Sequence, residues 1–195
     1  MSDKKLKQRD EIAKEYKWTI EAMYPDESIW EKDLEESVKA AGDFAKYSGR
    51  LTESAETLLS ALKENDAIWR KIEHAYVYAA MKKDEDNRVN KYQAMNDKCG
   101  SAIAKIAAAT SFFTPQLLEA SKEKIENFIE EEPGLEQYRF LLESTLREKE
   151  HVLSASEENI LAQMSEVTGA TSDVFKMLNN ADLTFGEVKD EDGDA

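Results

Sequence analysis

The chain has 195 residues, of which 41% are hydrophobic and 34% are charged. This length and composition exclude a generally disordered chain and allow one domain with a substantial core. The formal net charge of −15, from 41 acidic and 26 basic residues, disfavours binding to nucleic acid or to anionic membranes.

No stretch of the sequence approaches the roughly 18 uninterrupted apolar residues of a membrane span. The first ten residues are charged and lack the apolar centre of a secretory signal. The single cysteine, Cys99, cannot form an internal disulfide and fits a reducing compartment. We therefore expect a soluble cytoplasmic domain.

Residues 1–25 are predicted to form a polar lead-in and an extended surface segment, because an aromatic-rich stretch ends at Pro25. A helix is predicted to begin at Asp26 or Ser28, both of which are good capping residues. It should end shortly before Gly49, since glycine is the preferred residue just after a helix.

The next pattern predicts two helices that are separated by a break at Asn65–Asp66, with Thr52 or Ser54 capping the first of them. A long helix is then predicted from about residue 88 to 111. Its alanines would let neighbouring helices approach closely, so we expect this helix to be central.

Shorter helices are predicted in the second half of the chain. Thr114–Pro115 would cap one, Ser121 would open another, and Pro133–Gly134 would end it before a further helix over residues 135–148. Ser154 and Glu157 form a capping box that predicts one more helix, followed by a last short one. The fold class is therefore all-α, with a multi-helix, bundle-like domain over residues 26–182.

Residues 183–195 depart from this helical pattern. Leu183–Val188 alternates apolar and polar residues like a strand, and Lys189–Asp194 reads as a tight turn. A strand calls for a partner strand, so this segment is predicted to be an incomplete β-hairpin that leads into a region missing from the chain.

Helical spacing also predicts which side chains fill the core. The residues expected to be largely buried on facing helices are Trp30, Leu34, Leu58, Leu62, Trp69, Ile72, Ile103, Ile106, Leu141 and Leu142.

The sequence assigns no catalytic residue and no metal ligand. Its histidines, His74 and His151, do not form an HExxH motif, so we interpret His74 as a packing or solvent-edge residue. Cys99 lies in the alanine-rich helix and is interpreted as a core thiol. Tyr76 and Tyr78 are candidates for lining a cleft, although their side chains point in different directions on a helix, which favours one buried and one exposed tyrosine.

Several local segments, taken together and in order, resemble the N-terminal region of oligoendopeptidase F, of the thimet-oligopeptidase-like family of zinc metallopeptidases. The segments that carry the resemblance are Arg9–Ile12 with Tyr16–Trp18, Tyr76–Ala79 with Asp84–Asp86, Ser111–Pro115, Leu178–Phe185 and Asp190–Gly193. None of them is a catalytic signature by itself.

The resemblance implies a non-catalytic helical domain that forms one wall of a deep cleft and limits substrates to short peptides. Zinc, HExxH and a further Glu ligand would lie in a C-terminal catalytic region, so no cofactor is expected in this chain alone. That region and short peptides would be its partners, and exposed surfaces could support a homodimer. The alternative is a free-standing acidic helical module for protein interaction.

Overall fold

The computed structural model describes residues 9–86 and 89–149, together with positions 171, 174, 175, 178, 179 and 183. The chain forms two compact units, Met1–Lys149 and Glu150–Ala195. Every regular element in the described part is helical, which confirms the all-α fold class. The predicted domain boundary at residue 182, the helix that begins near Ser154 and most of the predicted hairpin lie outside the described residues.

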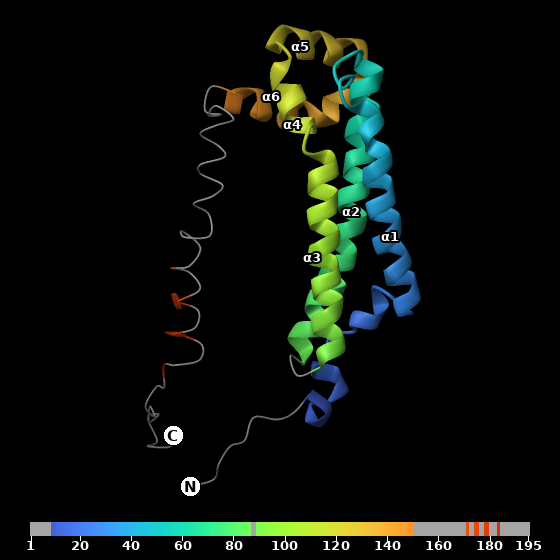
Figure 1. The fold of residues 1–195 in the computed structure, drawn as a ribbon, viewed down its shortest axis with the longest axis vertical. Helices are drawn as coiled ribbons and strands as arrows, with labels where there is room; N and C mark the ends of the chain where they lie inside the picture. The colour runs from blue at the N-terminus through green and yellow to red at the C-terminus, as the bar shows by residue number, and fades with distance from the viewer. Residues whose placement is uncertain are drawn as a thin grey trace. The chain divides into compact units, whose positions relative to one another are not determined.

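The first unit is built around the long helices α1 (Glu27–Asp43), α2 (Ala55–Glu85) and α3 (Asn90–Thr110). They lie side by side, α1 and α3 running in one direction and α2 in the other (Figure 1). Each of the three contacts the other two, so the core lies along their common axis.

Short helices pack at the end of this bundle where α2 begins and α3 ends (Figure 1). These are α4 (Phe113–Glu119), α5 (Lys122–Glu131) and α6 (Arg139–Glu148), with the 3₁₀ helices η4 (Phe44–Tyr47) and η5 (Pro133–Tyr138) as connections. Ser121 caps α5, because its hydroxyl accepts a hydrogen bond from the Lys124 amide. Thr114, by contrast, lies inside α4, so the predicted cap at Thr114–Pro115 is wrong.

Helix α1 shows how the sequence specifies these elements. Its N-cap is Asp26, whose carboxylate accepts a hydrogen bond from the Ser28 amide at 2.7 Å.

The turn after η4 contains Gly49, which has a φ of 76° and therefore a backbone conformation that other residues rarely adopt. Its amide donates to Gln116 Oε1 at 2.9 Å, which joins this turn to α4.

Helix α2 runs without interruption from Ala55 to Glu85, so the predicted break at Asn65–Asp66 is wrong. Neither residue removes a backbone donor, and the helical penalty of each is only about 0.7 kcal/mol or less. Tyr138 of η5 donates a hydrogen bond to Asp66 Oδ2 at 2.8 Å, so tertiary packing uses this polar position. Ser54 caps the helix, as one of the two predicted alternatives.

The N-terminal segment is not extended, contrary to prediction. It contains the 3₁₀ helices η1 (Arg9–Glu11), η2 (Lys14–Tyr16) and η3 (Ile20–Ala22). Ile20 and Tyr24 fix this segment to the bundle, because both side chains are buried in the core.

Most of the predicted core is confirmed. Trp69 and Ile103 are only partly buried, and Leu141 is 45% exposed, so burial of Leu141 was predicted wrongly. Adjacent positions on a helix point about 100° apart, and α6 directs Leu142 rather than Leu141 inward. Of the alanines of α3 that were expected to allow close packing, Ala102 is buried and Ala109 is partly buried, whereas Ala104, Ala107 and Ala108 are exposed. The predicted core residues that are buried are Trp30, Leu34, Leu58, Leu62, Ile72, Ile106 and Leu142.

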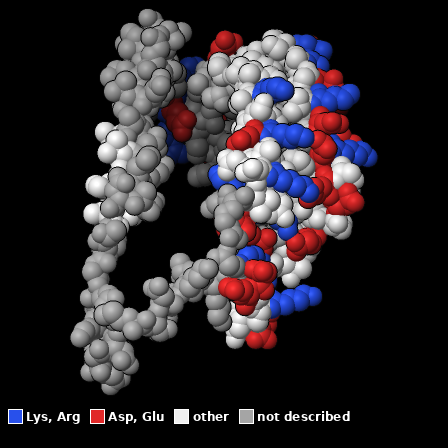
Figure 2. Space-filling model, turned by 60° about the horizontal axis from the view of Figure 1, so that its bottom comes forward, with Lys and Arg blue, Asp and Glu red and all other residues white. Residues whose placement is uncertain are grey.

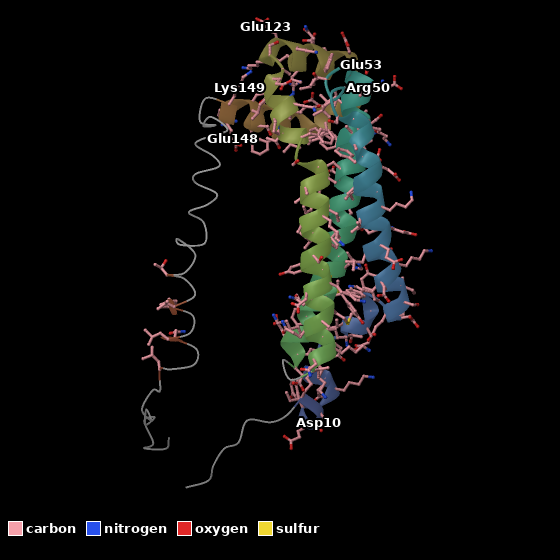
Figure 3. All side chains as sticks on the ribbon, viewed as in Figure 1. Asp10, Arg50, Glu53, Glu123, Glu148 and Lys149 are labelled. Atoms are coloured by element: carbon pink, nitrogen blue, oxygen red, sulfur yellow. The ribbon has the colours of Figure 1, made fainter. Side chains whose placement is uncertain are left out.

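Charged side chains of both signs are interleaved over the face of the molecule that Figure 2 shows, so the net negative charge is dispersed there. Labelled acids such as Asp10 of η1 and Glu123 of α5 lie at opposite ends of the first unit (Figure 3). Among the described residues, no helix is long and apolar enough to cross a membrane.

Candidate functional site

Aromatic and charged side chains gather where the N-terminal segment meets α2. The Tyr24 ring lies 5.1 Å from the Tyr78 ring and 4.8 Å from the His74 ring, measured between centroids. Its hydroxyl donates to Asp33 Oδ2 of α1 at 3.0 Å. Burial raises the pKa of Tyr24, and the neighbouring Asp33 carboxylate raises it further. Tyr24 is therefore a neutral hydrogen-bond donor that joins the N-terminal segment to α1 and α2.

Tyr76 and Tyr78 point to different environments. Tyr78 is 3% exposed and belongs to the core, whereas Tyr76 is 41% exposed on the surface of α2. The expectation of one buried and one exposed tyrosine is confirmed. Lining of a cleft by either residue stays a prediction.

Lys82 is the charged centre of this region and was missed by sequence reasoning. It is only 7% exposed, yet it forms ion pairs with Glu21 of η3 and, at 3.6 Å, with Glu85. Arg9 of η1 also pairs with Glu85. A signal for Lys82 existed, because it follows the buried Ala75, Tyr78 and Ala79 at helical spacing and so lies on their face.

Aromatic rings surround the Lys82 ammonium group. Its Nζ lies 6.0 Å from the centroid of Tyr78 and 5.8 Å from that of Tyr92 on α3, which is the range of cation–π contacts. The hydrogen bond from Lys82 lowers the pKa of Glu21. The cluster thus favours the charged form of Glu21 and fixes η3 against α2, an arrangement suited to positioning rather than to proton transfer.

Cys99 is fully buried, which confirms its interpretation as a core thiol. Burial raises its pKa to about 11, so the unreactive thiol form predominates at neutral pH. Nearby, Trp30 Nε1 donates to the Ala75 carbonyl at 2.9 Å and fixes α1 against α2. Cys99 is thereby part of the packing between helices and not a nucleophile.

His74 is exposed beside the Tyr24 ring, as expected for a solvent-edge histidine, and His151 lies outside the described residues. Within residues 9–86 and 89–149 and the six further described positions, no group of three or more His, Cys, Asp or Glu side chains could hold a metal ion. The described part of the chain therefore does not fit a zinc site.

Comparison with known proteins identifies the class. The family model described as Oligopeptidase F matches residues 116–185. Oligopeptidase PepF of Bacillus subtilis is 37% identical over 96% of this chain, which covers 28% of that protein. Group B oligopeptidase PepB of Streptococcus agalactiae is 35% identical over 95% of this chain, which covers 31% of it.

A solved structure agrees with these matches. Oligoendopeptidase-F from Enterococcus faecium superposes with a TM-score of 0.65 and 34% identity, covering 87% of this chain and 33% of that one. The matched proteins are peptidases by name. The chain belongs to the oligoendopeptidase F family, which confirms the resemblance found in the sequence, and it spans about a third of the length of these relatives.

Proposed function

We propose that this chain is the non-catalytic helical region of a zinc-dependent oligoendopeptidase of the cytoplasm. In the longer protein it forms one wall of the substrate cleft and limits substrates to short peptides. The observation that carries the proposal is 37% identity to an oligopeptidase over 96% of this chain but only 28% of the relative. Zinc and the residues that bind it would belong to the remaining part.

The described residues support a scaffolding role. Two buried ionisable groups take part in packing: Lys82 is paired with Glu21 and Glu85, and Cys99 is enclosed between helices. The helices bury their apolar side chains against one another, as required of a wall that keeps its shape beside a cleft. No step of peptide hydrolysis is assigned to any residue of this chain.

The test of this proposal compares two proteins. One is the purified 195-residue chain, and the other, the joined protein, is this chain followed by the remaining region of a full-length relative. We expect the chain alone to hold no stoichiometric zinc by metal analysis and to leave a fluorogenic peptide intact. The joined protein should cleave short peptides and lose this activity with a chelator. Chelator-sensitive cleavage by the chain alone would contradict the proposal, and a joined protein without activity would favour the free-standing interaction module.

The cleft-wall role is tested separately in the joined protein with Tyr76→Ala. Tyr76 is largely exposed, so its removal should spare folding while raising KM for short peptides. Val77→Ala is the matched control, because Val77 is similarly exposed, at 43%, but points about 100° away on α2. Equal kinetic constants for both variants and the unsubstituted protein would exclude Tyr76 from the cleft.

A further inference from the structure

Helix α6 carries the most exposed large apolar side chain among the described residues. Phe140 is 80% exposed, and its neighbour Leu141 is 45% exposed. Leu142, by contrast, is fully buried, and Phe140 precedes it by two positions, which is about 200° around the helix. Phe140 therefore points away from the core of the bundle.

Within the first unit, α6 is packed on one side. It contacts α4, α5 and η5 at the end of the bundle (Figure 1). Leu142 is buried in this contact, and Leu146, one turn further along, is partly buried against the same core. The opposite side of α6, at Phe140, is not covered by the described elements of this unit.

The polar neighbours of Phe140 are compatible with an apolar contact. Arg139 pairs with Glu136 at 2.8 Å and with Glu143 at 3.5 Å, so its charge is balanced within η5 and α6. Ser144 follows Phe140 by one helical turn on the same side and is uncharged. Interface centres are enriched in aromatic residues and depleted of charged ones, and Phe140 fits such a position.

The comparisons indicate what covers this side of α6. The chain spans only 28–33% of its relatives, so about two-thirds of the longer protein lies outside it. Domains of one chain typically bury roughly 600–1,500 Å² against each other. The Oligopeptidase F family model matches residues 116–185, which include α6, whereas Tyr16 and Trp18, which are 75% and 77% exposed, lie outside the match.

We propose that Phe140 and Leu141, together the α6 docking face, bind the remaining region of the oligoendopeptidase. Phe140 enters an apolar pocket of that region, and burial of its ring supplies much of the contact energy. The inference rests on the proposed function for the existence of the remaining region. It adds the surface by which this chain is held to that region, and it assigns Phe140 no part in hydrolysis.

The test measures access to the α6 docking face with a thiol introduced by Leu141→Cys, which leaves Phe140 in place. In the 195-residue chain a maleimide should modify this thiol rapidly, while the buried Cys99 stays unmodified. In the joined protein the rate should fall at least roughly tenfold, the factor for an opening free energy of about 1.4 kcal/mol. Mass spectrometry of the peptide that contains position 141 gives both rates.

A second substitution tests whether Phe140 is the anchor. Adding Phe140→Glu should restore fast modification in the joined protein, because a carboxylate is costly to bury in an apolar pocket. In the 195-residue chain the same substitution should leave the urea midpoint unchanged, since Phe140 is exposed there. Val77→Glu is the matched control, because it adds the same charge at an exposed apolar position of α2 and should leave modification of the joined protein slow.

Equal modification rates in the 195-residue chain and the joined protein would overturn the proposal, as would slow modification that Phe140→Glu leaves unchanged. Slow modification already in the 195-residue chain would also overturn it. If that protection disappears on dilution, a second copy covers the face, and if it persists, the chain covers the face itself.

Peptide cleavage is measured separately on the same joined protein. Cleavage with fast modification contradicts the docking face alone, whereas slow modification without cleavage supports the docking face and contradicts the proposed function.

Discussion

Along α1, α2 and α3 the buried positions are mostly apolar, whereas residues 9–24 contribute only Ile20, Tyr24 and the partly buried Met23 to the core and add polar contacts. The bundle buries long runs of side chains at helical spacing, for example Met95, Cys99, Ala102 and Ile106 on α3. The N-terminal segment has short 3₁₀ turns that cannot present such a continuous face.

This difference determines how each region responds to change. Apolar burial stabilises the bundle in proportion to area and does not depend on charge–charge attraction, which salt screens. The N-terminal segment depends on the ion pairs of Lys82 and Arg9 and on the hydrogen bond of Tyr24, which are local and responsive to pH. The N-terminal segment should therefore detach before the bundle unfolds.

The largest expected effect lies in the bundle. Ile106→Ala removes a fully buried side chain and should lower the free energy of unfolding by roughly 2–5 kcal/mol, measured by urea denaturation. Leu141→Ala is the contrasting variant, because Leu141 is 45% exposed and its loss should cost about 0.5–1 kcal/mol. Equal losses in the free energy of unfolding for the two variants would contradict the difference in burial between Ile106 and Leu141.

Lys82→Met should produce the next largest effect. Methionine retains much of the apolar stem but removes the charge that holds Glu21 and Glu85, at a cost of about 1–2 kcal/mol because Glu21 is largely exposed. Amide exchange should accelerate over residues 9–22 and remain slow in α1–α3. Uniform acceleration throughout would show that the N-terminal segment and the bundle open as one unit.

Tyr24→Phe isolates the hydrogen bond to Asp33 while preserving the ring. We expect a loss of about 1 kcal/mol in the free energy of unfolding, since Asp33 retains Lys71 as a partner. Tyr76→Phe serves as the control, because Tyr76 is exposed on the surface of α2 and has no part in this contact. An equal loss in the free energy of unfolding of Tyr76→Phe would contradict the role assigned to the Tyr24 hydroxyl.

The smallest effect is a shift in titration. The pKa of Glu21 is lowered below its ordinary value by Lys82, so its contribution is complete above the ordinary pKa of 4.5 and is lost as the pH falls through the lowered value. Amide NMR of Ile20 and Ala22 between pH 6 and 3 should report a midpoint below 4.5. In Lys82→Met the midpoint should rise, and an unchanged midpoint would exclude this pair as the cause.

Helical periodicity was sufficient to predict the fold class and most of the core, because Trp30 and Leu34, like Leu58 and Leu62, recur at a spacing that a helix brings to one face. Periodicity could not separate Leu141 from Leu142, since a surface helix of ten residues buries little and a shift of one position changes the answer. Nor could it exclude a break at Asn65–Asp66, where the hydrogen bond from Tyr138 comes from a distant part of the chain.

The ion pairs could not be predicted from the sequence for a different reason. Lys82 and Glu21 are 61 positions apart, and no local pattern pairs them. Lys98 and Glu31 are 67 positions apart, and their ion pair likewise requires the register between α1 and α3. Residues that meet across helices are fixed by packing, which spacing along one helix does not encode.

The burial of Cys99 also has a practical consequence for labelling. Because the thiol is fully enclosed and its pKa is raised to about 11, maleimide dyes at neutral pH should leave it untouched while the bundle is folded. Cysteines introduced on the surface of the N-terminal segment and of α2 can then carry a donor and an acceptor fluorophore without removing the native residue. Because unfolding exposes this thiol, the rate at which a maleimide modifies it measures how often the helices separate.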